Sequence, residues 1–306
     1  MTPTRTHLTH IVSRMTLIGP AAVALLLAMP APAAEQPAQI QLTGVIRDFA
    51  AYGDPGGHPS MERANIPAGL KPRWVIANLV HPRLGPDGKP RFTNNGLVME
   101  SPWTDAAGNN IAMQMPAAPG DVPGVLTNKL WNDYLDPASF RELFNDVPGV
   151  NLSAPLTLTF DLQADGTYVF DARTAPNMGG PPKGFFPIDD LLYGNYAGNG
   201  GIHNFHFSFE LHGDFIYDDA AGQIFEFNGD DDVWVFVNGR IVVDLGGRHS
   251  PKSMFVDMNR LGLTHGKPYR LSFFLLERRT SGSNCIITTN LPLVSGDQVS
   301  VSSAFD

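Results

Sequence analysis

Cysteine is almost absent from this chain of 306 residues, because Cys285 is the only one. A single cysteine cannot form an intrachain disulfide, so core burial has to supply the stability. Positive charge is also scarce: 21 Lys and Arg residues stand against 30 Asp and Glu, and the formal net charge is −9. Such an acidic chain is a poor partner for phosphate backbones and anionic membranes. We therefore predict no nucleic-acid binding and no membrane insertion.

Catalytic motifs are missing too. The sequence contains no Gly-x-Ser-x-Gly, no His-Glu-x-x-His, no phosphate-binding loop and no dinucleotide fingerprint. A carbohydrate-active enzyme remains a weaker alternative, since a glycosidase needs only two carboxylates about 5–9.5 Å apart and acids are abundant here. We predict that the protein is not an enzyme.

The apolar residues at the start of the chain follow the order of a secretory signal. Arg5 and Arg14 are followed by the apolar residues 15–29 and by Ala31-Pro32-Ala33, an A-x-A cleavage site. Pro20 interrupts the apolar stretch, which is too short to span a bilayer. We predict that residues 1–33 are a signal peptide and that the protein is secreted, to the periplasm or the extracellular space.

The stretch 225–247 (FEFNGDDDVWVFVNGRIVVDLGG) dominates the pattern of the mature chain. Its segment 233–237 is apolar on both faces, which is typical of a strand in the middle of a packed sheet pair. Asn238-Gly239 is a strong hairpin signal, because both central residues of a type I′ turn need positive φ. We predict a buried hairpin with Trp234 or Phe236 packed between sheets.

Three adjacent acids, Asp230, Asp231 and Asp232, stand at the entrance of this hairpin. Carboxylates about 4 Å apart repel one another by roughly 1 kcal/mol in water and roughly 4 kcal/mol near a protein surface. The acids are therefore either fully solvated or supplied with a cation. Ca²⁺ is the hard cation that binds such oxygens in secreted proteins. Both interpretations stay open, and the second assigns all three acids as Ca²⁺ ligands.

Alternating or continuous runs of apolar and β-branched residues predict further strands over residues 39–45, 156–160, 167–170, 203–212, 271–276 and 286–289. In the segment 203–212 (HNFHFSFELH), the phenylalanines share one face, and His206, Glu210 and His212 lie on the other. That polar face is either exposed or buried in hydrogen bonds beside the N-terminal half. A metal on it is a weaker alternative.

One segment, 128–145 (NKLWNDYLDPASFRELFN), predicts a helix. Asp136-Pro137 fits the N-cap and the first helical position, and Phe140, Leu143 and Phe144 share one face. The rest of the N-terminal half is rich in glycine and proline, which indicates loops.

Several spaced motifs resemble the fibro-slime domain family, over about residues 41–290. They are GDDDVWVFVNGRIVVDLGG, GVIRDF at 44–49, HPSME at 58–62 and GFFPID at 184–189. The acids, apolar strand and Asn-Gly turn resemble, more distantly, the carbohydrate-binding β-sandwich named after anthrax protective antigen. The chain departs from the fibro-slime pattern at Ser60, Arg248 and Arg279. The family has an acid, a small apolar residue and a histidine at these positions.

The resemblance implies a mainly β fold, an antiparallel β-sandwich with a loop-rich N-terminal half and one or two short helices. Residues 34–152 would form that loop-rich part, 153–292 the sandwich core and 293–306 a tail. In sugar-binding members of the wider group, the acids that match Asp230 and Asp231 hold a Ca²⁺ that binds sugar hydroxyls.

Three further residues are candidates for ligand binding. Glu277 ends an apolar strand, where a lone buried carboxylate costs several kcal/mol, so it must pair or coordinate. Arg278 or Arg279 is the expected ion-pair partner. His249 follows two glycines that permit close approach, and Asn284 lies in the polar segment after Glu277.

We predict a secreted, Ca²⁺-dependent module for adhesion that binds an extracellular glycan or matrix polymer without catalysis. The alternative is a purely structural protein of an extracellular matrix (slime), in which the three adjacent acids hold a metal, or nothing, for stability.

Overall fold

The computed structural model describes residue 1 and residues 36–62, 74–130, 135–180 and 183–296. The chain from Pro37 onward forms one compact unit. This unit is mainly β and its sheets are antiparallel, so the predicted fold class is confirmed. In the described residues, the helical elements are two short 3₁₀ helices, η1 Phe140–Phe144 and η2 Met258–Leu261.

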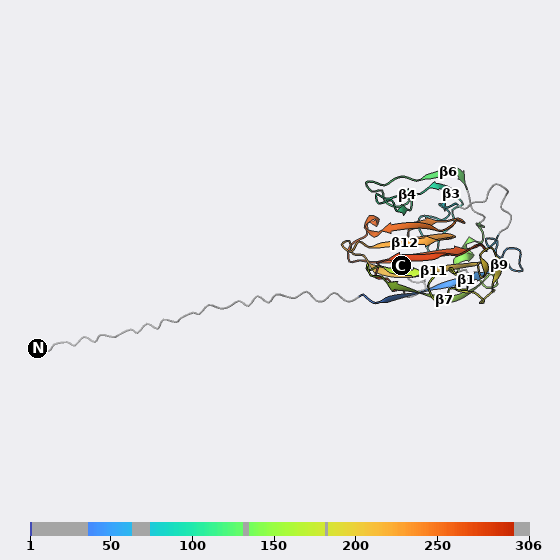
Figure 1. Cartoon of the computed structure of the whole chain (residues 1–306). Coiled ribbons are helices and arrows are strands. Elements are labelled where there is room, and N and C mark those ends of the chain that lie inside the picture. Colours follow the sequence, from blue (N-terminus) through green and yellow to red (C-terminus); the bar gives the residue numbers. More distant parts are fainter. Residues whose placement is uncertain (2–35, 63–73, 131–134, 181–182, 297–306) are drawn as a thin grey trace. The chain divides into compact units, whose positions relative to one another are not determined.

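Eleven strands form one large sheet in the order β14-β13-β16-β11-β1-β7-β8-β17-β12-β15, with β18 paired to β11. Figure 1 shows these strands running side by side. Their bounds are β1 Gln39–Phe49, β7 Asn151–Leu162, β8 Tyr168–Asp171, β11 Phe207–Ile216, β12 Ile224–Gly229, β13 Asp232–Val237, β14 Arg240–Leu245, β15 Lys252–Asp257, β16 Pro268–Glu277, β17 Cys285–Thr289 and β18 Val294–Ser295.

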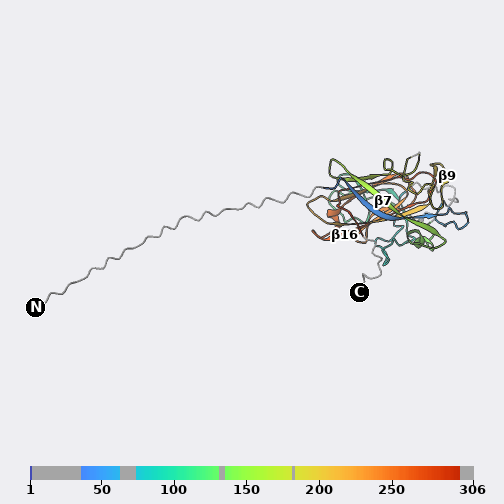
Figure 2. The same cartoon turned by 90° about the horizontal axis from the view of Figure 1, so that it is seen from below.

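The large sheet folds over on itself at β7, which is seen in Figure 2. This strand pairs with β1 along its length but with β8 only through Asp161 and Leu162. The strands from β14 to β7 make a first layer, and β8, β17, β12 and β15 make a second. Phe209 and Phe273 of the first layer share one core with Phe227 of the second. Side chains that meet in this way between two layers are consistent with a β-sandwich.

The central hairpin is buried, as predicted, and Asn238 (φ 50°) and Gly239 (φ 69°) have the positive φ of its turn. The predicted direction of its aromatic side chains is wrong. Trp234 and Phe236 point to the outer face of the first layer, under the N-terminal half of the chain. Alternation along the strand therefore sends Val233, not Trp234, into the space between the layers.

The N-terminal half covers that outer face with short elements and loops. Phe140 and Phe144 of η1 both contact the Trp234 ring edge to face, with ring centroids 6.0 and 6.5 Å apart. Three small sheets complete the structure. Their strands are β2 Ile76–Ala77, β3 Leu97–Ser101, β4 Trp103–Thr104, β5 Asn110–Ile111, β6 Val125–Leu130, β9 Tyr196–Gly198 and β10 Gly201–His203. Two of the sheets, β2-β3-β6 and β4-β5, belong to the N-terminal half, and the third, β9-β10, lies in the loop before β11.

The helix predicted within 128–145, with Asp136 as its N-cap and Pro137 as its first position, is present as the shorter 3₁₀ helix η1, which begins three residues later. Residues 128–130 belong to β6, residues 131–134 lie outside the described part, and the helical residues are those of η1. Ser139 precedes η1, and the Asp136 carboxylate accepts a hydrogen bond from its amide (2.8 Å). The predicted apolar face is buried on the sheet, so tertiary packing fixes this short turn.

The predicted domain boundaries remain predictions. The signal peptide lies outside the described residues apart from residue 1, and the boundary between 152 and 153 falls inside β7. In the tail, β18 pairs with β11, and residues 297–306 are not described. No helix in the described part has the length and apolar composition needed to cross a membrane.

Candidate functional site

The acidic stretch lies where the chain passes from the second layer to the first. Gly229 ends β12 and Asp232 begins β13, so Asp230 and Asp231 make the crossing, and the peptide bond between them is cis. The register pairs Asp232 with Leu276, which brings Glu277 to this end of the sandwich. It pairs Gly229 with Cys285, which brings Asn284 to the same place. We call this set of strand ends the acidic end.

Asp230 is held by Asn284, one of the predicted ligand-binding residues. Its Oδ1 accepts a hydrogen bond from the Asn284 amide (2.6 Å), and its Oδ2 accepts one from Asn284 Nδ2 (2.9 Å). Burial raises the pKa of Asp230, although these hydrogen bonds and the nearby His249 act in the opposite direction. The two residues the sequence proposed separately therefore act as one unit.

Asp232 faces away from the other two acids. Its Oδ1 accepts a hydrogen bond from the Gly247 amide (2.6 Å), and its Oδ2 accepts one from Arg278 Nε (2.6 Å). The Asp232 and Arg278 side chains are 0% and 2% exposed. This buried ion pair ties the start of β13 to the end of β16. Asp230 and Asp231, and not Asp232, are therefore the aspartates whose negative charges raise the pKa of Glu277.

Glu277 is completely buried. Its Oε1 accepts a hydrogen bond from the Arg279 amide (3.1 Å), whereas its Oε2 forms no hydrogen bond. Burial, and then the negative charges of Asp231 and Asp230, raise the pKa of this carboxyl well above its ordinary value. The predicted ion pair with Arg278 or Arg279 is wrong, because Arg278 pairs with Asp232 and the Arg279 side chain reaches Glu62 (3.4 Å).

His249, predicted as a ligand contact, is buried and faces backbone carbonyls. Its Nδ1 lies 3.0 Å from the Ser250 carbonyl oxygen and its Nε2 lies 3.2 Å from that of Leu245. Both ring nitrogens are therefore engaged by backbone carbonyls, one at the end of β14 and one in the loop that follows it. Arg248, which precedes it, is also buried at the acidic end. The role of His249 as a ligand contact stays a prediction.

The chemistry of the acidic end fits a hard divalent cation. Asp230, Asp231 and Glu277 offer carboxylate oxygens, which Ca²⁺ prefers, and the buried Glu277 Oε2 has no hydrogen-bond partner. The adjacent aspartates do not converge on one point, however. In the described chain, the single set of three ligand atoms within 4.8 Å of one another belongs to Asp218, Asp219 and His265, on largely exposed turns.

The polar face of β11 is buried rather than exposed, as one of the two interpretations predicted. Glu210 is its centre: Arg47 Nη1 (3.1 Å) and His212 Nε2 (2.8 Å) contact its carboxylate, and Lys89 also donates to it. Burial opposes ionisation, but His212 and Lys89 outweigh it and lower the pKa of Glu210 to about 2. The contact with Lys89 was not predicted, because this residue lies in a loop 121 residues away from Glu210 in the chain.

Asp48, at the end of β1, is a buried acid that the sequence analysis missed. Its Oδ2 accepts hydrogen bonds from the Tyr193 amide (2.7 Å) and Asn204 Nδ2 (2.8 Å), while its Oδ1 accepts none. Burial raises its pKa to about 7. The register Asp48–Phe207–Glu277 places it at the same end of the first layer as Glu277. The sequence feature that could have revealed this buried acid is its position directly before Phe49, in a strand that contains other apolar residues.

The family model of the PA14 domain matches residues 188–303, the part that carries the acidic end and the central hairpin. Two relatives come from Dictyostelium discoideum. Protein psiJ is 39% identical over 169 residues (51% of this chain and 22% of psiJ), and protein psiD is 35% identical over 226 residues (71% of this chain and 36% of psiD). The chain thus covers about a fifth to a third of these relatives.

Among solved structures, an anti-sigma factor domain-containing protein is similar over 34% of this chain and 40% of its own, at 16% identity and a TM-score of 0.24. The chain therefore contains a region similar to the PA14 domain, a β-sandwich of carbohydrate-binding type, and has homologues among the psi proteins.

Proposed function

We propose that this chain is a secreted, Ca²⁺-dependent carbohydrate-binding module whose glycan site is the acidic end. The supporting observation is that one oxygen of the buried Glu277 carboxylate, Oε2, has no hydrogen bond, while the charges of Asp230 and Asp231 act on this carboxylate. All three residues lie in the PA14-like region. Burial, and then the charges of Asp231 and Asp230, favour the protonated form of Glu277 by raising its pKa. A cation held here by the three carboxylates would offset this repulsion, and Glu277 Oε2 would then serve as a ligand.

The residues of the acidic end divide into ligands and supports. Asp230, Asp231 and Glu277 would hold Ca²⁺, which supplies open coordination positions for sugar hydroxyls when bound. Asn284 holds both oxygens of Asp230 in place. Asp232 is a support, because its two oxygens are engaged by Gly247 and Arg278 and fix the strand that follows.

A structural role in an extracellular matrix is the second candidate. The Asp232–Arg278 ion pair favours it, because this pair neutralises one acid inside the protein without any metal. In a purely structural domain, the remaining carboxylates would likewise be neutralised inside the protein without a metal. PA14-type domains are typically binding modules, and catalysis has no supporting observation here.

A glycan array probed with and without EDTA separates the two candidates. Sugar-selective binding that needs Ca²⁺ and is lost in Asp231→Asn supports the module. The matched control is Glu100→Gln, which removes an exposed acid on β3 and leaves binding intact. Absence of glycan binding with Ca²⁺ and with EDTA would leave the structural role as the better explanation.

A further inference from the structure

The opposite end of the central hairpin carries a pocket of about 200 Å³. Four segments meet there: the β13–β14 turn, the residues after η2, the start of β16 and the loop around Gln114. At about 3.3 Å per residue, the six steps from Asp232 to Asn238 separate this pocket from the acidic end by roughly 20 Å. The pocket therefore shares no residue with the acidic end.

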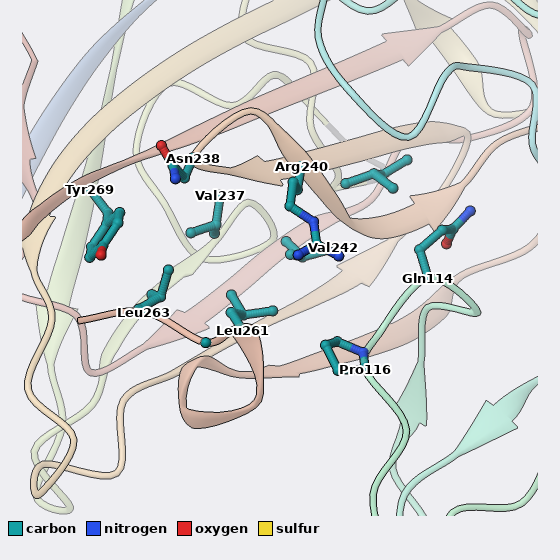
Figure 3. Close-up of a pocket in the computed structure, with 11 residues that line it drawn as sticks. Gln114, Pro116, Val237, Asn238, Arg240, Val242, Leu261, Leu263 and Tyr269 are labelled. Atoms are coloured by element: carbon teal, nitrogen blue, oxygen red, sulfur yellow. The ribbon is translucent and has the colours of Figure 1, made fainter. Parts of the chain in front are cut away.

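The pocket has an apolar floor and a polar wall. Figure 3 shows Val242, Leu261 and Leu263 among its lining side chains, with Arg240 between Tyr269 on one side and Gln114 on the other. An apolar floor with few polar groups is the usual composition of a small-molecule site. The volume suits a single small ring rather than a large ligand.

Arg240 carries a charge that the protein does not neutralise. No carboxylate among the described residues lies within ion-pair distance of it, although the chain as a whole is acidic. The arginines that flank the pocket differ: Arg260 pairs with Asp121 (2.5 Å) and Arg270 pairs with Asp214 (2.8 Å). An exposed guanidinium that remains unpaired beside a pocket is suited to a carboxylate from a ligand, which it can bind through two parallel hydrogen bonds.

Tyr269 supplies a hydrogen bond of the kind that a hydroxylated ring uses, whereas Gln114 lines the pocket with a fixed amide. Gln114 Nε2 donates to Asp244 (2.8 Å), which fixes the amide, and its buried Oε1 accepts no hydrogen bond. The Tyr269 hydroxyl accepts from the Thr264 amide (2.9 Å), which leaves its proton available. The negative face of the Tyr269 ring also suits the C–H face of a sugar.

We propose that this pocket is a second, metal-independent site that takes the carboxylated sugar ring of an acidic polysaccharide. Arg240 binds the carboxylate, the Tyr269 hydroxyl donates a hydrogen bond to a ring hydroxyl, and the Tyr269 ring packs against the sugar ring. This site goes beyond the proposed Ca²⁺-dependent function and does not need it.

The test is isothermal titration of the full chain with a galacturonate trisaccharide in EDTA, with the neutral galactose trisaccharide as the comparison. We expect the galacturonate to bind and Arg240→Gln to weaken it by about tenfold or more, as for the loss of a hydrogen bond to a charged group. Tyr269→Ala should weaken both sugars. Arg141→Gln, which removes an exposed arginine from η1, is the matched control and should bind like the wild type.

Three results would overturn the proposal: no galacturonate binding by the wild type, binding that Arg240→Gln leaves unchanged, or equal losses in Arg240→Gln and Arg141→Gln. The last result would mean diffuse charge attraction. Melting temperatures of all variants confirm that they fold. If galacturonate binding persists in Asp231→Asn and in EDTA, it does not depend on the acidic end. The proposal for one site can therefore fail without the other.

Discussion

Asp232 and Arg278 form an ion pair of 2.6 Å in which both side chains are almost completely buried. Removal of one partner from such a pair leaves an uncompensated charge in the interior and typically costs about 3–5 kcal/mol. We therefore expect Arg278→Met to lower the free energy of unfolding by that amount in urea denaturation. The control is Arg173→Met, which breaks an exposed pair with Asp171 and should cost less than about 1 kcal/mol. Equal effects of the two substitutions would contradict this prediction.

Substitution of Trp234 tests how the N-terminal half packs against the first layer. This side chain is fully buried between the first layer and η1, so Trp234→Ala should cost about 3–5 kcal/mol in the same denaturation assay. Trp74 is 50% exposed, and Trp74→Ala is the matched control, with an expected change of about 0.5 kcal/mol or less. A loss below about 1 kcal/mol at Trp234 would mean that the N-terminal half does not cover this face.

Asp48 should make the protein less stable as the pH rises. Its pKa in the folded protein is about 7, above the ordinary value of 3.8, so the folded state binds the proton more tightly than the unfolded state. The stability from this group is present below about pH 4. It is lost as the pH rises to about 7, at up to about 1.4 kcal/mol per pH unit.

The variant Asp48→Asn isolates this effect, because it resembles the protonated acid. We expect it to match the wild type in urea denaturation at pH 4 and to be more stable than the wild type at pH 8. Glu210 does not interfere, because its stabilisation is lost between about pH 4.5 and about pH 2 and to the same extent in both proteins. Parallel pH profiles of the wild type and Asp48→Asn would rule out a titrating Asp48.

Removal of Ca²⁺ should lower the melting temperature if the acidic end binds it. A ligand at a hundredfold excess over its Kd stabilises the folded state by about 2.7 kcal/mol, which corresponds to roughly 5–10 °C for a domain of this size. EDTA should abolish this gain in the wild type, and Asp231→Asn should lack it from the start. Glu100→Gln, which changes an exposed acid on β3, should respond to EDTA like the wild type. A wild-type melt that ignores EDTA would argue against the metal.

Arg248 should weaken Ca²⁺ binding. It is buried, and its neighbours in the chain, Gly247 and His249, lie close to Asp232 and Asp230, so its positive charge opposes a cation there. We expect Arg248→Met to tighten Ca²⁺ binding by roughly tenfold, measured by calorimetric titration. Arg141→Met changes an exposed charge on η1 and should have no effect. Unchanged or weaker binding in Arg248→Met would refute this role.

The sequence predicted the features that depend on local pattern. Alternation gave most strands of the large sheet, and Asn238-Gly239 gave the central turn, because both follow from neighbouring residues. The direction of Trp234 did not follow, since both faces of its strand are apolar and only the covering N-terminal half decides which one receives the large ring.

The candidate site was predicted in composition but not in pairing. The acids at 230–232, Glu277 and Asn284 do gather at one end, yet which acid meets Arg278 depends on the β13–β16 register. Likewise, Lys89 and Glu210 are brought together by a loop that has no pattern of its own. Long-range pairs of this kind are set by topology, which a local pattern does not contain.

The position of β13 also determines how the domain bears mechanical load. This strand is hydrogen-bonded on both sides, to β14 and β16, and it runs from the acidic end to the pocket. A pull applied between these two ends acts along the strand, so both ladders are loaded in shear and their bonds must break together rather than one after another. A polymer tethered at the two ends would therefore load both ladders of β13 at once.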